Sequence, residues 1–391
     1  MNRIKKYFTG ISRDVYFLTL ASFFGDISTE MLYPVLPIFL TQTLKAGGGV
    51  VGIVEGVAEA TKNIIQGFSG YLSDKFQRRK TIALIGFAFS AIAKPLIGVA
   101  TVWQGVLGAR FLDRLGSGSR SAPRDALIAS SVRQEYRGKA FGLEGVGDNL
   151  GAFLGPLIAI LLFFLLHINI RHLFYLAIIP GLMAVLMVAM VTERRPAAQA
   201  KAAVDLRLTR FPKTYWKYLA VTGIFGIGNS SNLFLILQIK NAGASLEITI
   251  FIYAFYNLVA ALISYPSGFW SDKFGRKPML LVSFIIFLIS YLGFALTRNI
   301  FLIGILFIFY GLYQGIFRTV GKSFATDLTP PELRASGVGW YSTVVGLSAL
   351  VASIIAGQLW DKVSHPAVFL YGVAFSLIGL LAFVIFIPNN K

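Results

Sequence analysis

Residues 70–78 read GYLSDKFQR, and residues 268–276 read GFWSDKFGR. The two segments share glycine, serine, aspartate, lysine, phenylalanine and arginine in the same order and at the same spacing. Further along each copy, Glu135 and Arg137 recur as Glu332 and Arg334 at almost the same separation. A repeat on this scale predicts a chain built as two related halves.

The composition around the repeat predicts an integral membrane protein. Hydrophobic residues make up 55% of the 391 residues and charged residues only 14%, whereas a soluble domain carries roughly 25% charged residues. Residues 151–166 and 278–297 contain no charge. A helix that crosses the hydrocarbon core needs about 20 largely apolar residues and satisfies its own backbone hydrogen bonds. We therefore expect an all-α membrane protein with 12 transmembrane helices in two six-helix bundles.

The apolar runs and the polar segments between them place the helices. We expect helices over residues 15–44, 48–73, 79–101, 103–128, 138–166, 172–192, 216–240, 246–271, 277–297, 299–322, 334–361 and 365–388. The longest polar stretch, 193–215, would link an N-terminal bundle over 1–192 to a C-terminal bundle over 216–391. The first apolar run is too long for a secretory signal peptide and lacks a small-residue cleavage site.

The net charge of +18 indicates how the chain is oriented in the membrane. Most lysines and arginines fall in the N-terminal segment and in the predicted loops on its side of the membrane, whereas few fall in the opposite loops. The opposite loops hold Lys45, Arg171, Lys240, Arg298 and Lys362. The positive-inside rule then places both termini and the linker in the cytoplasm of a multi-pass inner-membrane protein. The lipid bilayer is the expected partner, and no nucleic acid is expected.

The repeated segments resemble the loop motif of the major facilitator superfamily, which joins its second and third helices and its eighth and ninth helices. The matching residues are Gly70, Asp74, Lys75, Arg78, Gly268, Asp272, Lys273 and Arg276. Gln77 replaces a glycine that is usual in the first copy. The resemblance implies two bundles that rock around a central cavity, in a protein that is a monomeric transporter and not an enzyme. It also implies that the motif gates the cycle; the alternative is a solvated basic loop that serves topology alone.

Two further segments resemble this family. The fifth helix carries the pattern Gly142-x8-Gly151-x3-Gly155-Pro156, similar to a signature of drug/proton antiporters, with Ala159-Ile160 in place of its closing glycine pair. Small residues let helices approach closely, and the resemblance implies that this helix seals one face of an exporter. Arg110 stands where the family has a membrane-embedded arginine, but Asp113 and Arg114 replace the more typical Gln-Gly.

Ionisable residues inside the predicted spans are candidate coupling residues, because a charge at the bilayer centre costs about 2.5–3.5 kcal/mol on insertion scales. The acids are Asp26, Glu30, Glu55, Glu59, Asp113, Glu144 and Asp148, and the bases are Lys62, Lys94, Arg110 and Arg114. On this count the acids exceed the bases by three, so pairing leaves some carboxylates free to bind protons. The alternative, that buried ion pairs only join helices, stays open, above all for Glu144, Asp148 and Lys94.

The second half offers a different surface, polar and aromatic but nearly uncharged. We expect ligand contacts from Tyr33 of the first half and from Asn229, Asn232, Tyr253, Tyr256, Asn257, Tyr313, Gln314 and Arg318 of the second. Organic-ligand pockets are mostly apolar with a few polar anchors, which this set matches. The alternative is ordinary helix packing with interfacial tyrosines.

These residues favour a proton-coupled exporter, an antiporter, of a small organic molecule by alternating access. The alternative is a transporter, for export or import, of a metal ion, siderophore or organic anion. Carboxylates suit a divalent cation, but no His or Cys lies among them, which disfavours zinc or copper, so no metal site is expected. No nucleophile–base pair or P-loop occurs, so we expect no catalytic residues, no cofactor, and the proton gradient as energy source.

Overall fold

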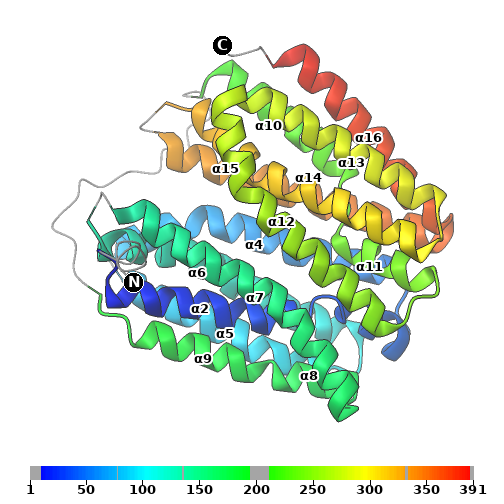
Figure 1. Ribbon diagram of the computed structural model, residues 1–391, viewed down its shortest axis with the longest axis horizontal. Helices are drawn as coiled ribbons and strands as arrows, with labels where there is room; N and C mark the ends of the chain where they lie inside the picture. Colours follow the sequence, from blue (N-terminus) through cyan, green and yellow to red (C-terminus); the bar gives the residue numbers. More distant parts are fainter. Residues whose placement is uncertain (1–9, 77, 134–135, 194–210, 331–332, 388–391) are drawn as a thin grey trace, which may run out of the picture.

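The computed structural model describes residues 10–76, 78–133, 136–193, 211–330 and 333–387. These residues form helices joined by short loops, and no strand occurs among them. The helices lie in two lobes, one from α2 to α9 and one from α10 to α16 (Figure 1). Helix α2 begins, and α16 ends, at the same end of the molecule, which we call the terminal end; the other is the opposite end.

The first lobe contains the helices expected from residues 15–192. Its elements are α2 (Arg13–Glu30), α3 (Leu36–Ile38), the π-helical η1 (Phe39–Thr43), α4 (Gly48–Phe76), α5 (Arg79–Val99), α6 (Trp103–Ser131), α7 (Arg137–Leu166), α8 (Ile170–Leu176) and α9 (Ile178–Ala189). The first expected helix is interrupted after Glu30, where Pro34 and Pro37 lack the amide N–H that a continuous helix needs. Pro180 explains the break between α8 and α9 in the same way.

The second lobe repeats this plan. Its elements are α10 (Lys213–Gly228), α11 (Asn232–Asn241), α12 (Leu246–Phe274), α13 (Arg276–Leu296), α14 (Ile300–Asp327), α15 (Arg334–Lys362) and α16 (His365–Phe386). The expected helix 216–240 is interrupted at Asn229, whose φ of −94° and ψ of 88° are not helical. Ser231 then accepts a hydrogen bond from the amide of Leu233 at 3.2 Å and begins α11. Asn and Ser side chains compete with helical hydrogen bonds in this way.

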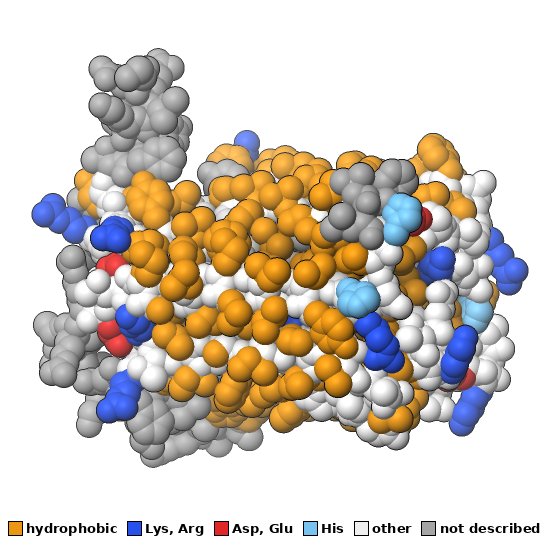
Figure 2. Space-filling model, turned by 90° about the horizontal axis from the view of Figure 1, so that it is seen from below, with side chains coloured by type: hydrophobic (Ala, Val, Ile, Leu, Met, Phe, Trp, Pro, Cys, Tyr) orange, Lys and Arg blue, Asp and Glu red, His pale blue; other side chains and the backbone are white. Residues whose placement is uncertain are grey.

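The surface matches a membrane protein. Nine helices in the described part of the chain are long and apolar enough to cross a membrane. Figure 2 shows an apolar belt between two ends that carry the charged side chains. Helices α2, α4 and α6 fall outside the nine because each holds several charged residues within one span length. The all-α membrane fold is as expected, and the charged helices are collected in one lobe.

Helices α4 and α15 join the two lobes at a glycine-lined contact. A Cβ atom at Gly52 would meet the backbone carbonyl oxygen of Ser353, and Gly67 faces Gly339. At the opposite end, Asp361 accepts hydrogen bonds from the amides of Gly48 (2.6 Å) and Gly49 (2.7 Å), which caps α4 with a residue of the other lobe. Only glycine permits this approach of two backbones.

Replacing Gly52 with valine is expected to lower the free energy of unfolding by about 1–3 kcal/mol, the usual cost of overpacking. The added side chain would collide with the Ser353 carbonyl and push α15 away from α4. Thermal unfolding in detergent measures the effect. Gly108→Val on α6 is the matched control, because a Cβ there meets nothing within 4 Å. Equal midpoints for the two variants would contradict a tight contact at Gly52.

Candidate functional site

Four arginines on α6 form ion pairs with acids on neighbouring helices. Arg110 and Arg114 reach α4, Arg120 reaches α2, and Arg124 reaches α7. The four side chains occupy nearly four turns of α6, which explains why this helix is too charged to qualify as an apolar span. Helix α6 is therefore the centre of a buried charge network in the first lobe.

Arg110 makes the most buried contacts of the network. Its Nη2 lies 2.5 Å from Oε2 of Glu55, and its Nη1 donates to Oδ2 of Asp113 at 3.0 Å. Glu55 is 0% exposed. Asp113 also accepts a hydrogen bond from Ser90 on α5. Arg114 adds ion pairs of 3.6 Å to Glu55 and 3.3 Å to Glu59. Charge-assisted hydrogen bonds thus tie α4, α5 and α6 together.

The second part of the network joins α2, α6 and α7. Arg124 Nη1 lies 2.8 Å from Oε1 of Glu144 and 3.9 Å from Oδ1 of Asp148. Ser22 on α2 donates to the same Glu144 oxygen at 2.9 Å. Arg120 Nη2 lies 3.9 Å from Oδ1 of Asp26. Each of these acids therefore has a basic neighbour within the first lobe.

Small residues on α7 explain how α2 comes so close. Gly151 and Gly155 lie directly against the backbone of α2 at Phe23 and Ile27. Gly142 faces open space, and Pro156 lies inside α7 without ending it. The glycine pattern thus seats a partner helix of the same lobe, and α7 also packs against α12 of the other lobe.

The expected excess of three carboxylates is wrong, because Arg120 and Arg124 were left out of the count. Both lie inside the expected helix 103–128, and both reach acids that had seemed unmatched. Asp125 in the same helix also belongs in the count and pairs with Arg124 at 2.9 Å, so this set holds eight acids and six bases. A full count of charges along residues 103–128 would have found both arginines from the sequence.

Glu30 differs from the other acids because its hydrogen-bond partners belong to the second lobe. Tyr253 Oη donates to Oε2 of Glu30 at 2.9 Å, and Asn257 Nδ2 donates to the same oxygen at 3.4 Å. Tyr33 stacks on Tyr253 with ring centroids 5.4 Å apart. The guanidinium of Arg110 lies 5.9 Å from the centroid of the Tyr33 ring. Glu30 and Tyr33 thus connect the charge network to the other lobe.

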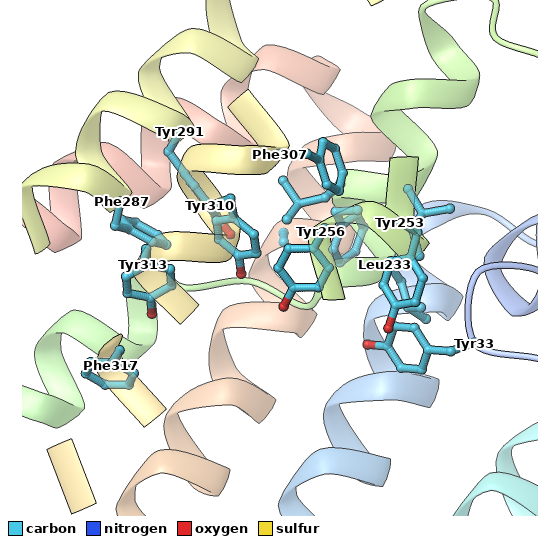
Figure 3. Packing of buried hydrophobic residues seen from close by; sticks show 14 of the residues in the cluster. Tyr33, Leu233, Tyr253, Tyr256, Phe287, Tyr291, Phe307, Tyr310, Tyr313 and Phe317 are labelled. Atoms are coloured by element: carbon cyan, nitrogen blue, oxygen red, sulfur yellow. The ribbon is translucent and has the colours of Figure 1, made fainter. Parts of the chain in front are cut away.

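The second lobe presents tyrosines around the break between α10 and α11 (Figure 3). Asn229 Nδ2 donates to Tyr313 Oη at 2.9 Å. Asn232 accepts from Tyr310 Oη at 2.8 Å and donates to Tyr256 Oη at 3.2 Å. The asparagines that interrupt the helix therefore satisfy tyrosine hydroxyl groups inside an otherwise aromatic cluster. The sequence does not predict these contacts, because helical periodicity shows which residues share a face of one helix and not which residues of another helix they meet.

The remaining expected residues are placed as follows. Gln314 is half-buried and Arg318 is exposed on α14. The surroundings of Gly70 and the side chains of Asp74, Lys75 and Asp272 lie outside what the structure describes. Arg78 and Lys273 are exposed, Gly268 has only an ordinary contact with Thr319, and Arg276 binds Asp327 of its own lobe at 2.9 Å. Among the described residues, no group of three or more His, Cys, Asp or Glu side chains could hold a metal ion.

Comparison with known proteins agrees with this architecture. The Major Facilitator Superfamily matches residues 18–239 and 218–391. The chain is 34% identical over 380 residues to an uncharacterised MFS-type transporter of Methanocaldococcus jannaschii, across 95% of this chain and 94% of that protein. It is 21% identical over 379 residues to the multidrug resistance protein MdtH of Salmonella arizonae, across 95% and 92% of the two chains.

Solved structures show the same fold. A mutant of the nucleoside transporter NupG superposes with a TM-score of 0.80 at 15% identity, across 96% of this chain and 100% of that one. The family match spans nearly all of the sequence, and the two-lobed fold agrees with it. The chain belongs to the Major Facilitator Superfamily, and it is a transporter and not an enzyme.

Proposed function

We propose that this transporter is a proton-coupled exporter of a small organic molecule and works as an antiporter. The observation that carries the proposal is the contact of Glu30 with Tyr253 and Asn257 across the lobe interface. An ionised Glu30 accepts both hydrogen bonds. A protonated Glu30 accepts them more weakly, and its new O–H group needs an acceptor of its own. Proton binding at Glu30 would therefore weaken the contact between lobes, which is the link that a proton-driven cycle needs.

The substrate is proposed to meet the tyrosine and asparagine groups of the second lobe. Tyr256, Tyr310 and Tyr313 supply aromatic surface, and Asn229 and Asn232 supply donors and acceptors. Such surfaces suit organic ligands with an apolar body and a few polar groups. The similarity to a protein named for multidrug resistance supports export.

A second candidate is an organic anion, which one side chain favours. Arg318 on α14 is exposed, and it forms no hydrogen bond or ion pair with the residues that the structure describes. An arginine available to a ligand suits carboxylate or phosphate groups, which it binds with two parallel hydrogen bonds. Substrate panels should therefore include organic anions beside organic cations and neutral compounds.

Inverted membrane vesicles test proton coupling directly. Respiration acidifies the vesicle interior, and acridine orange reports the pH difference. An antiporter that exports a compound from the cell moves it into the inverted vesicle while protons leave, so adding a substrate should restore the dye fluorescence. Vesicles without the protein, and vesicles treated with a protonophore, are the controls. If no cationic, neutral or anionic compound discharges the gradient, proton antiport is excluded for that panel.

The orientation is also a proposal, with the terminal end in the cytoplasm. The sequence contains no cysteine, so a single introduced cysteine reports its own side of the membrane. A cysteine at Lys201 should react with an impermeant maleimide only in inside-out vesicles. A cysteine at Lys362, which ends α15 at the opposite end, is the matched control and should react in intact cells. The reverse pattern would invert the topology.

A further inference from the structure

Lys94 is a buried lysine that the ion-pair network does not include. It lies on α5 and is 2% exposed. Within the part of the chain that the structure describes, its ammonium group makes no hydrogen bond and no ion pair. A buried charge without a partner is expensive, so this lysine calls for a physical explanation.

The side chain borders a small cavity inside the first lobe. The cavity offers about 10 Å³ to the centre of a water-sized sphere, and its polar lining consists of Thr29, Tyr33, Lys94, Arg110 and Asp113. A space of about 10–15 Å³ with several polar groups can hold one water molecule. The cavity thus provides a place where water could solvate the amine of Lys94.

The charged groups around Lys94 come from two helices. Helix α6 contributes Arg110, Asp113, Arg114 and Arg120, and α2 contributes Asp26 with Tyr33 just beyond its end. Helix α8 faces the cavity with the apolar ring of Phe174. The nearest acid, Asp113, already accepts hydrogen bonds from Arg110 and Ser90. Asp113 is the acid that attracts the ammonium group of Lys94 most strongly, but it is shared with Arg110, so Lys94 has no counter-ion of its own.

We propose that Lys94 is a proton-binding residue of the transport cycle and exchanges its proton with Asp113 through a water molecule in this cavity. The Nζ–H bond breaks as the water accepts a proton, and the water passes one of its protons to the carboxylate. The products are a neutral amine and a carboxylic acid, and Asp113 then releases the proton to bulk water, so deprotonation of Lys94 lowers the charge of the protein by one. The inference rests on the proposed proton coupling and assigns it a second site beside Glu30.

The position of the proton would be felt at the lobe interface through Arg110. Once the proton has left, Asp113 no longer faces the positive charge of Lys94 and attracts Arg110 more strongly, and Arg110 also binds Glu55 and lies over the ring of Tyr33. Tyr33 stacks directly on Tyr253 of the second lobe. Lys94 would thus influence contact between the lobes through three intermediate side chains, Asp113, Arg110 and Tyr33, without touching the second lobe itself.

A cysteine at Ser353 can report this influence without a known substrate. Ser353 is 1% exposed, and its backbone lies against Gly52 where the lobes meet. In the S353C protein, N-ethylmaleimide should react only when α4 and α15 separate. Its rate is measured from pH 6 to 9 and divided by the rate for the same protein unfolded in detergent, which removes the pH dependence of the thiol. Each coupled proton can change the opening equilibrium by up to about tenfold per pH unit.

Two variants fix the charge of residue 94. Lys94→Arg keeps the positive charge, so the corrected rate should stay near its low-pH value. Lys94→Met removes the charge, so the rate should stay near its high-pH value. Both variants should therefore reduce the slope of the corrected rate against pH. Lys94→Gln is a second uncharged variant whose side chain can still form hydrogen bonds with water, in case methionine disturbs folding. A lysine with a purely structural role would instead leave Lys94→Arg with the slope of the parent protein.

The outcomes separate this inference from the proposed function. If the position-94 variants keep the parent slope while Glu30→Gln flattens it, protons act at Glu30 and the inference about Lys94 is wrong. If the parent protein shows no slope and no compound discharges the gradient in vesicles, the proposed proton coupling itself fails. Reduced slopes in both Lys94→Arg and Lys94→Gln support the inference.

Discussion

Replacing Arg110 with methionine is expected to lower the free energy of unfolding by about 3–5 kcal/mol, the usual cost of removing one partner from a buried ion pair. Glu55 is 0% exposed and loses its contact at 2.5 Å, and Asp113 loses its contact at 3.0 Å. Both carboxylates would stay buried with less positive charge beside them. Transport should be lost as well, because the altered helices carry the coupling network.

A matched double variant separates loss of packing from loss of charge balance. In Arg110→Met with Glu55→Leu, one of the two stranded carboxylates is gone, so part of the lost stability should return. Transport should not return, since neither charge is restored. Chemical unfolding of the purified protein in detergent gives the stabilities. An unfolding midpoint for Arg110→Met equal to that of the parent protein would show that the guanidinium is not needed to neutralise these acids.

The sequence alone predicts the all-helical membrane fold and the order of the helices well, because long apolar runs have few alternatives in a membrane. It does not predict where those helices are interrupted. The breaks after Glu30 and at Asn229 occur at corresponding places in the two lobes, and both are local effects of proline or of asparagine and serine. A hydropathy pattern averages over about 20 residues and does not register such short interruptions.

The sequence predicts which residues belong to the candidate site, but it does not predict which of them contact one another. The sequence identifies Glu30 and Tyr253 as separate candidates, but they are 223 positions apart, and only the fold shows that they share a hydrogen bond. The contact between α4 and α15 was also missed, although Gly48, Gly52 and Gly56 follow one another at four-residue spacing. The family resemblance directed attention to the glycines of α7, which pack within the first lobe.

The double change Asp26→Asn with Glu30→Gln is expected to reduce pH-driven transport by about 5- to 150-fold, the range of typical coupling free energies between sites. The two carboxylates stand one turn apart on α2 but have different partners. Asp26 lies 3.9 Å from Arg120 inside the first lobe, whereas Glu30 accepts hydrogen bonds from the second lobe. The amides keep the shape of both side chains and remove their ability to bind a proton.

Inverted vesicles with an imposed pH gradient measure the loss, and binding of an uncharged ligand to the purified protein should be spared. Glu247→Gln is the matched control, because this acid is exposed in the first turn of α12, away from the charge network. Of the single changes, Glu30→Gln should have the larger effect, since of these two acids it is Glu30 that accepts hydrogen bonds from the second lobe. Undiminished gradient-driven transport by the double variant would remove Asp26 and Glu30 as coupling residues. Coupling would then have to arise at Lys94 or among Glu55, Glu59, Glu144 and Asp148, the acids paired with α6.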